Sequence, residues 1–110
     1  MATLKDLKLK TGVCKRTLKE FRSYEAEEKR EAAKTQSMRD NNADPYDIKQ
    51  QVNVLAESRM MIPDCRRRLE ASLEALREVV AEAENDETCK EGEELAAAQT
   101  VLAEVEPMFQ

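Results

Sequence analysis

The sequence contains no histidine and no tryptophan, and only 4% of its residues are aromatic. Histidine is the commonest general base of enzymes and the commonest ligand of catalytic zinc, so its absence argues against both kinds of chemistry. Glycine and proline are also scarce, with two and three copies. A charged fraction of 37% and a regularly spaced hydrophobic fraction of 41% therefore predict a helical bundle or coiled coil rather than a disordered chain.

The three cysteines, Cys14, Cys65 and Cys89, show no CxxC spacing, so the sequence predicts neither a disulfide framework nor a zinc site. Cys65 is expected to be a small buried residue rather than a reactive thiol. The phosphate-binding patterns GxxxxGK[ST] and GxGxxG are absent, and carboxylate pairs such as Glu27 and Glu31 lie among solvated charges. We therefore predict no enzyme activity, no catalytic residue, no metal, no cofactor and no small-molecule substrate.

The length of 110 residues predicts a single domain, residues 1–110, with room for only a modest core. A net charge of −5 and a pI near 4.9 argue against a nucleic acid partner, whose phosphates require a basic surface. No stretch approaches the roughly 18 apolar residues of a membrane span. Together with the lack of a predicted disulfide framework, these features predict a cytoplasmic protein with no membrane partner.

Hydrophobic residues at steps of three and four predict three helices, over about residues 2–39, 45–84 and 88–106. The stripe of the first helix consists of Leu4, Leu7, Thr11, Cys14, Leu18, Phe21, Glu25, Glu28, Ala32, Thr35 and Met38. The second stripe is a heptad seam in which Arg59 and Arg66 fill the two intermediate positions between Ile48, Val52, Leu55, Ile62, Leu69, Leu73, Leu76, Val80 and Ala83. The third stripe consists of Leu95, Ala98, Leu102, Val105 and Phe109.

Two short polar segments predict the turns between these helices. In residues 40–45, Asp44 is expected to cap the second helix and Pro45 to be its first residue. In residues 85–88, Thr88 has the spacing of a capping box with Glu91, although Gly92 leaves the start of the third helix open. Short links predict an all-α, antiparallel up-down-up three-helix bundle, which should be elongated because the first helix alone would run about 55 Å.

The most unusual segment surrounds Pro63, which interrupts a strongly helical pattern. Proline removes one amide donor and clashes with the carbonyl group four residues earlier, at a cost of about 3 kcal/mol in an ordinary helix. Because the heptad register continues on both sides, we predict a second helix that is kinked at Pro63 rather than a loop. Met60 and Met61 precede the kink, and methionine adapts to irregular partners, although both residues could simply fill the bend.

The run Glu57-Ser58-Arg59-Met60-Met61-Ile62-Pro63-Asp64-Cys65, followed by Arg67-Arg68-Leu69-Glu70, closely resembles the signature of the tubulin-binding cofactor A family. Further matches to the family are residues 7–12, 14–16, 24–25 and 44–51. The resemblance spans roughly residues 4 to 83, and beyond residue 83 it consists of acidity and helical pattern alone.

The resemblance implies a tubulin-folding cofactor, a chaperone that captures and stabilises quasi-native β-tubulin released from the cytosolic chaperonin and passes it toward assembly of the α/β-tubulin heterodimer. It implies β-tubulin as the partner, a cytoplasmic, cytoskeleton-associated location and no nucleotide. We expect the contact residues around the kink and on the preceding turns: Tyr46, Asp47, Glu57, Arg59, Met60, Met61 and Asp64. The heptad seam leaves open a structural module that self-associates as a coiled coil, and it is compatible with either a monomer or a homodimer.

Overall fold

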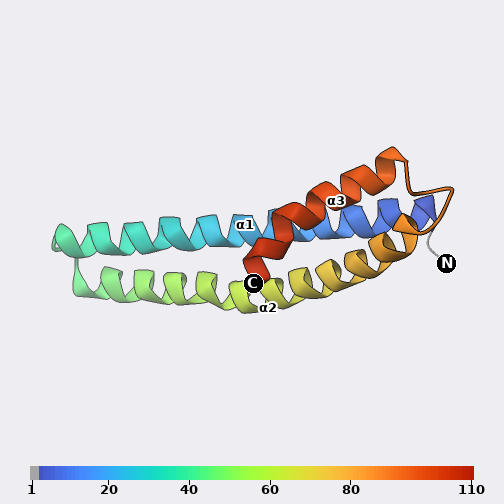
Figure 1. The fold of residues 1–110 in the computed structure, drawn as a ribbon. Helices are drawn as coiled ribbons and strands as arrows, with labels where there is room; N and C mark the ends of the chain where they lie inside the picture. The colour runs from blue at the N-terminus through green and yellow to red at the C-terminus, as the bar shows by residue number, and fades with distance from the viewer. Residues whose placement is uncertain (1–2) are drawn as a thin grey trace. The chain divides into compact units, whose positions relative to one another are not determined.

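The structure is a computed structural model that describes residues 3–110, and all regular secondary structure in that range is helical. Along the chain, α1 spans Leu4–Asp40, α2 spans Pro45–Glu84 and α3 spans Glu93–Val105, followed by a short 3-10 helix, η1, over Glu106–Phe109 (Figure 1). The prediction of an all-α protein with three main helices is confirmed. None of the helices within residues 3–110 is long and apolar enough to cross a lipid bilayer.

The turn between α1 and α2 is built as the sequence predicts. The amide of Ala43 donates to the carbonyl oxygen of Met38 at 2.9 Å, and Asn42 adopts the left-handed conformation with a φ of 54°. This geometry is a Schellman motif, in which asparagine is one of the few residues that tolerates a positive φ. Asp44 then caps α2, because its Oδ1 accepts a hydrogen bond from the amide of Tyr46 at 2.8 Å.

The third helix begins at Glu93, five residues later than the predicted start at residue 88. The predicted capping box does not form, because Thr88 is used inside the preceding turn. Its amide and its hydroxyl donate to Oδ1 of Asp86 at 2.8 and 2.6 Å. The helix instead starts after Gly92, which occupies the N-cap position in an extended conformation and offers no side-chain acceptor.

Contacts divide the chain into two compact units. The three-helix unit comprises the described part of Met1–Lys19 together with Arg67–Gln110, and the hairpin unit comprises Glu20–Arg66. Helix α2 is continuous from Pro45 to Glu84 and contains Pro63, so the predicted helix on both sides of the proline is confirmed. The kink and the single elongated domain stay predictions.

In the three-helix unit, α2 and α3 are antiparallel. Nε2 of Gln99 donates to Oε2 of Glu84 at 3.3 Å, and Nη2 of Arg77 lies 3.5 Å from Oε2 of Glu106, just after α3. The later residue of α2 therefore pairs with the earlier residue of the C-terminal segment, as expected for helices that run in opposite directions. This unit contains most of the buried hydrophobic side chains of the described residues. They are Leu7, Cys14, Leu18, Leu69, Leu73, Leu76, Val80, Ala83, Cys89, Leu95, Ala98, Val101 and Val105.

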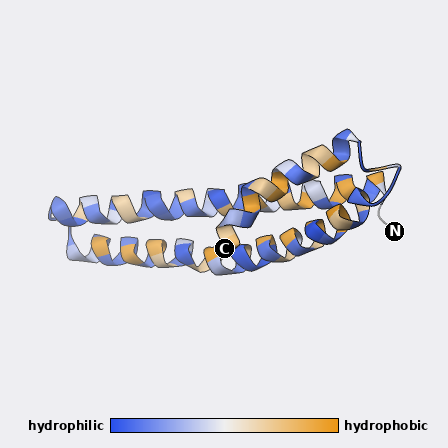
Figure 2. Cartoon of the chain, viewed as in Figure 1, coloured by the Kyte–Doolittle hydropathy of each residue, from blue (hydrophilic) through white to orange (hydrophobic). Residues whose placement is uncertain are grey.

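In the hairpin unit, the segments of α1 and α2 are antiparallel as well. Nε2 of Gln51 donates to Oε2 of Glu31 at 2.7 Å, and Nε of Arg59 donates to Oε1 of Glu28 at 3.0 Å. The core of this unit is lean, and Figure 2 shows hydrophilic colours over much of its α1 segment. Its buried side chains are the hydrophobic Phe21, Leu55 and Cys65 and the polar Thr35, Gln51 and Ser58.

The seam of α2 differs from the predicted one at three positions. Val52, Arg59 and Arg66 were assigned to the seam, and all three are exposed. The residues immediately before them, Gln51, Ser58 and Cys65, are buried instead. Polar side chains fit here because their hydrogen bonds are kept, as when the hydroxyl of Ser58 donates to the carbonyl oxygen of Leu55 at 2.8 Å.

The other two stripes need smaller corrections. In α1, Leu4 and Glu25 are exposed, because Leu4 lies in the first turn of the helix and Glu25 lies where the unit has only two helical segments. In α3, Val101 is buried, whereas the predicted Leu102 is half-buried. Phe109, predicted for the same stripe, lies in η1 and is half-buried.

Leu73 tests the core of the three-helix unit, because its side chain is 0% exposed. We expect Leu73→Ala to lower the free energy of unfolding by about 2–5 kcal/mol through lost burial and a residual cavity. Leu9→Ala is the control, since Leu9 is 55% exposed, and it should change stability by less than about 1 kcal/mol. Urea unfolding followed by circular dichroism measures both variants, and equal losses would contradict the assigned core.

Thr11 is a site where stability can be gained. Its hydroxyl is buried and makes no hydrogen bond within the described residues. We expect Thr11→Val to raise the free energy of unfolding by about 1 kcal/mol, because a methyl group of similar shape replaces an unpaired polar group. Thr17→Val is the matched control, since the hydroxyl of Thr17 donates to the carbonyl oxygen of Val13 at 2.8 Å. Stabilisation at Thr17 but not at Thr11, measured by thermal unfolding, would refute this account.

Candidate functional site

The candidate contact residues all lie on α2 within the hairpin unit, and all are exposed. They are Tyr46, Asp47, Glu57, Arg59, Met60, Met61 and Asp64. Met60 is 73% exposed and Tyr46 is 66% exposed, the highest values among the large hydrophobic side chains of the described residues. Hydrophobic side chains of this size are usually buried, so their exposure calls for an explanation.

Spacing along α2 places four of these residues on one face. Glu57, Met60 and Asp64 follow one another at steps of three and four, so they are neighbours on the helix surface. Tyr46 precedes Glu57 by about three helical turns and shares the same face. This face lies away from the buried seam of α2, which accounts for its exposure.

Two further candidates, Asp47 and Met61, lie on the adjoining face. Each is seven residues from Val54, which is 44% exposed and was not selected from the sequence. The heptad spacing from Met61 is the signal that could have identified Val54. We call the combined surface of Tyr46, Val54, Glu57, Met60, Met61 and Asp64 the outer surface of α2.

The side chain of Arg59 is directed toward α1, where it forms an ion pair with Glu28, and it is therefore not part of the outer surface. Its Nε lies 3.0 Å from Oε1 of Glu28, and the two side chains are 58% and 23% exposed. A pair with this exposure contributes at most about 1 kcal/mol to stability. Arg59 therefore lies at the edge between α1 and α2 rather than beside Met60.

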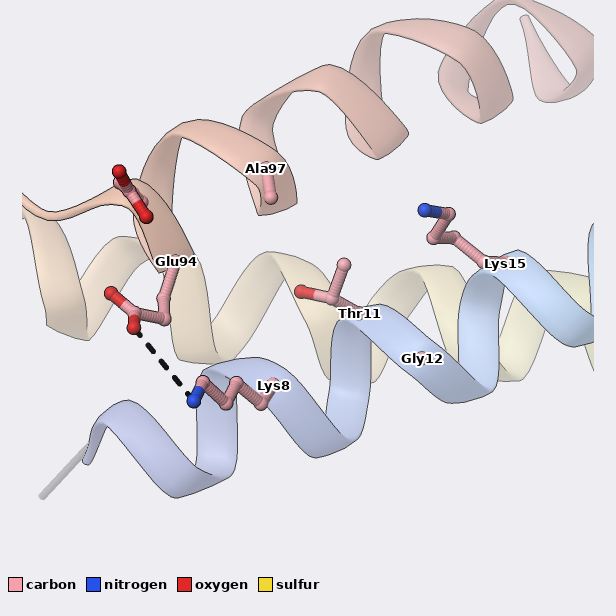
Figure 3. Close-up of a pocket in the computed structure, with 7 residues that line it drawn as sticks. Lys8, Thr11, Gly12, Lys15, Glu94 and Ala97 are labelled. Carbon is pink, nitrogen blue, oxygen red and sulfur yellow. Dashed lines mark ion pairs between the residues drawn. The ribbon is translucent and has the colours of Figure 1, made fainter.

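A groove of about 440 Å³ lies in the three-helix unit, between the beginnings of α1 and α3 (Figure 3). It is lined by Lys8, Thr11, Gly12, Lys15, Glu93, Glu94 and Ala97. Nζ of Lys8 lies 3.9 Å from Oε1 of Glu94, so lysines and glutamates balance each other here. The unpaired hydroxyl of Thr11 is buried and is not available to a ligand in the groove. No cluster of three side chains able to hold a metal ion occurs within residues 3–110.

Comparison with known proteins identifies the family. The sequence model described as tubulin binding cofactor A matches residues 2–102. The chain belongs to the tubulin binding cofactor A family. The resemblance inferred from the block around Pro63 is therefore confirmed, and the match extends beyond residue 83 to include most of α3.

Individual relatives of the family agree in sequence and in structure. The chain is 56% identical to tubulin-folding cofactor A of Arabidopsis thaliana, covering 99% of this chain and 96% of that protein. It is 45% identical to human tubulin-specific chaperone A, covering 93% and 92%. The crystal structure of the Arabidopsis cofactor superimposes with a TM-score of 0.88, covering 94% of this chain and 95% of that one. The human tubulin chaperone cofactor A gives a TM-score of 0.79 with 44% identity, over 94% and 97% of the two chains.

The three cysteines of this family member are buried, and none of them forms a disulfide bond. Cys14 and Cys65 are 0% exposed and Cys89 is 1% exposed, which confirms the expectation that Cys65 is a small buried residue. Burial raises the pKa of the Cys14 thiol above its usual value, and a hydrogen bond with Ser72 opposes that shift to a smaller extent. Because the thiolate is the reactive form, Cys14 is protected both by burial and by its raised pKa.

Native cysteines should therefore react only when the structure opens. We expect alkylation by iodoacetamide at pH 8 to be at least about tenfold slower in buffer than in urea, because unfolding exposes the thiols. The variant Ser23→Cys is the control, since Ser23 is exposed and the introduced thiol should react at the unfolded rate. Mass spectrometry over time resolves each cysteine, and a native thiol as fast as the introduced one would contradict its burial.

Proposed function

We propose that this chain is a tubulin-folding cofactor that captures quasi-native β-tubulin released from the cytosolic chaperonin. In this role it holds the client in the cytoplasm and passes it toward pairing with α-tubulin. The observation that carries the proposal is membership of the tubulin binding cofactor A family over residues 2–102. The 56% identity with a protein named tubulin-folding cofactor A supports it.

The proposal assigns a binding role to the chain and no catalytic step. The candidate residues are hydrophobic, carboxylate and guanidinium side chains spread along one helix. Groups of these kinds supply contact area and ion pairs, which is what capture of a polypeptide requires. The absence of histidine from the sequence favours the same interpretation.

The outer surface of α2 is the proposed contact for β-tubulin. Tyr46 offers a large aromatic ring with a polar tip, a combination that is common at the energetic centres of interfaces. Met60 and Met61 offer unbranched, polarizable side chains that adjust to an irregular partner. Full burial of an exposed methionine contributes about 1.5–3 kcal/mol, so two methionines and a tyrosine could dominate the affinity. Glu57 and Asp64 would border these anchors and favour donors on the partner.

Arg59 completes the candidate site from the edge of the helix. Its guanidinium group is held by Glu28 but remains 58% exposed, so further donors of the same group can reach an acceptor on the client. Asp47 lies near the other end of the site, in the first turn of α2. A client that contacts both residues would span about three turns of the hairpin unit's α2 segment.

The double variant Tyr46→Ala with Met60→Ala tests this surface. Since both side chains are exposed, circular dichroism should stay unchanged while capture of β-tubulin weakens at least about tenfold. Size-exclusion chromatography of mixtures with β-tubulin, titrated to obtain a Kd, measures the effect. Leu9→Ala is the control, because it removes an exposed hydrophobic side chain from the three-helix unit. Capture that is as tight as in the unaltered chain would exclude the outer surface from the interface.

Sedimentation velocity separates this proposal from a self-associating coiled-coil module. The leucines of the heptad seam that suggested self-association are buried within the two units, and Leu55 and Leu73 are 8% and 0% exposed. A coiled coil with a second copy would therefore have to use a different surface. A stable higher oligomer that does not change on addition of β-tubulin would support the module, whereas a small species that forms a new complex supports the cofactor.

A further inference from the structure

Helix α3 shows which kind of helix packs against α1 and α2 in the three-helix unit. It is an acidic amphipathic helix that contains no basic residue between Glu93 and Val105. Its buried side is formed by Leu95, Ala98, Val101 and Val105. Cations of both neighbouring helices border it, since Lys8 of α1 lies 3.9 Å from Glu94 and Arg77 of α2 lies 3.5 Å from Glu106, the residue that follows α3.

The basic border on α1 recurs at heptad spacing in the hairpin unit. Lys8 and Lys15 both line the groove against α3 and are seven residues apart. Two further steps of seven lead to Arg22 and Lys29, which are also basic and exposed. Because seven residues return to nearly the same side of a helix, these two cations occupy the register that borders α3 in the other unit.

The register on α2 shows the same recurrence together with a change in burial. Leu73 is buried in the three-helix unit, and steps of seven toward the N-terminus lead through Arg66 to Arg59 and Val52. All three are exposed in the hairpin unit, which contains only two helical segments. Positions that α2 buries where a third helix is present are therefore open where the unit has none.

Exposed apolar residues lie beside these cations on α2. Steps of seven from Arg77 toward the N-terminus lead through Glu70 to Pro63 and Ala56, and both of these residues are exposed in the hairpin unit. We call Arg22, Lys29, Val52, Ala56, Arg59 and Pro63 the third-helix strip. Two carboxylates lie near the strip: Glu25, seven residues after Leu18, and Glu28, which pairs with Arg59. The three cations of the strip outnumber these two carboxylates, although the chain as a whole has a net charge of −5.

We propose that the third-helix strip binds an acidic amphipathic helix of a partner protein, seated on the hairpin unit as α3 is seated on the three-helix unit. Charge complementarity selects this occupant, because the strip combines an apolar floor with cations on the α1 and α2 sides. A second hairpin unit would instead place cations against cations. The identity of the natural partner rests on the proposed function: if that function holds, the acidic helix is a segment of the captured client.

A peptide copy of α3 and η1 is the probe for this site. A fluorescein-labelled peptide of residues 93–109 is titrated with the full chain and followed by fluorescence anisotropy. A second peptide, with glutamine in place of its four glutamates, keeps the hydrophobic side and removes the charge. We expect the acidic peptide to bind at least about tenfold more tightly at low salt and to lose this advantage at 1 M salt, because exposed charges are screened. Equal binding of the two peptides would overturn the proposal.

Adjacent residues of α1 supply a matched pair of variants. Lys29→Glu reverses a charge in the strip, whereas Arg30→Glu makes the same change at an exposed position on another side of the helix. We expect Lys29→Glu to weaken peptide binding about three- to tenfold and Arg30→Glu to leave it unchanged. Lys8→Glu reports whether the peptide merely exchanges with α3 in the three-helix unit. Binding that depends on Lys8 and not on Lys29 would overturn the proposal.

Parallel measurements keep this proposal and the proposed function distinguishable. A chain that captures β-tubulin but ignores the acidic peptide would refute the strip alone. A chain that binds the peptide through Lys29 but never captures β-tubulin would refute the proposed client alone. Sedimentation of the unaltered chain tests a second copy as the occupant, and self-association that Lys29→Glu abolishes would overturn a partner protein in that place.

Discussion

Close packing along one stripe of α2 is the constraint from which the other features follow. Small side chains occupy several of its positions, among them Ser58, Cys65 and Ser72, so the neighbouring helix can approach closely. The serine hydroxyls donate to carbonyl oxygens of their own helix at 2.8 Å, which removes the penalty of burying them. Once this stripe is buried, helical periodicity alone directs Tyr46 and Met60 away from the core.

Features determined by neighbouring residues were predictable from the sequence, and features determined by distant partners were not. The turn before α2 was predictable because Asp44 and Pro45 act on their own backbone. The seam position of Gln51 was not, because its burial depends on a hydrogen bond to Glu31, twenty residues earlier in the chain. Hydrophobicity favoured Val52 at that point, and the hydrogen bond decided the outcome. The predicted start of α3 at Thr88 was wrong for a similar reason, since Thr88 could cap a helix but instead donates to Asp86 within the turn.

The candidate site divides along the same line. Met60 and Met61 were expected to contact a partner because they precede Pro63 and have adaptable side chains, and both prove to be exposed. The orientation of the Arg59 side chain toward α1 could not be predicted locally, because it depends on a hydrogen bond to Glu28, 31 residues earlier in the chain. The resemblance to the tubulin binding cofactor A family depends on the residue identities around Pro63, and the family model that matches residues 2–102 confirms it. Hydrophobic periodicity alone could not have predicted the family.

The unequal distribution of the core links stability to binding. Buried leucines and valines gather in the three-helix unit, whereas the hairpin unit buries Phe21, Leu55 and Cys65 beside polar residues. Because the hairpin unit buries fewer apolar side chains than the three-helix unit, we expect its local opening to require less free energy. A partner that covers the exposed positions of this unit adds the hydrophobic contacts that its own chain does not provide. Binding would then stabilise the folded hairpin unit by mass action, because the partner binds the folded surface and not the opened one.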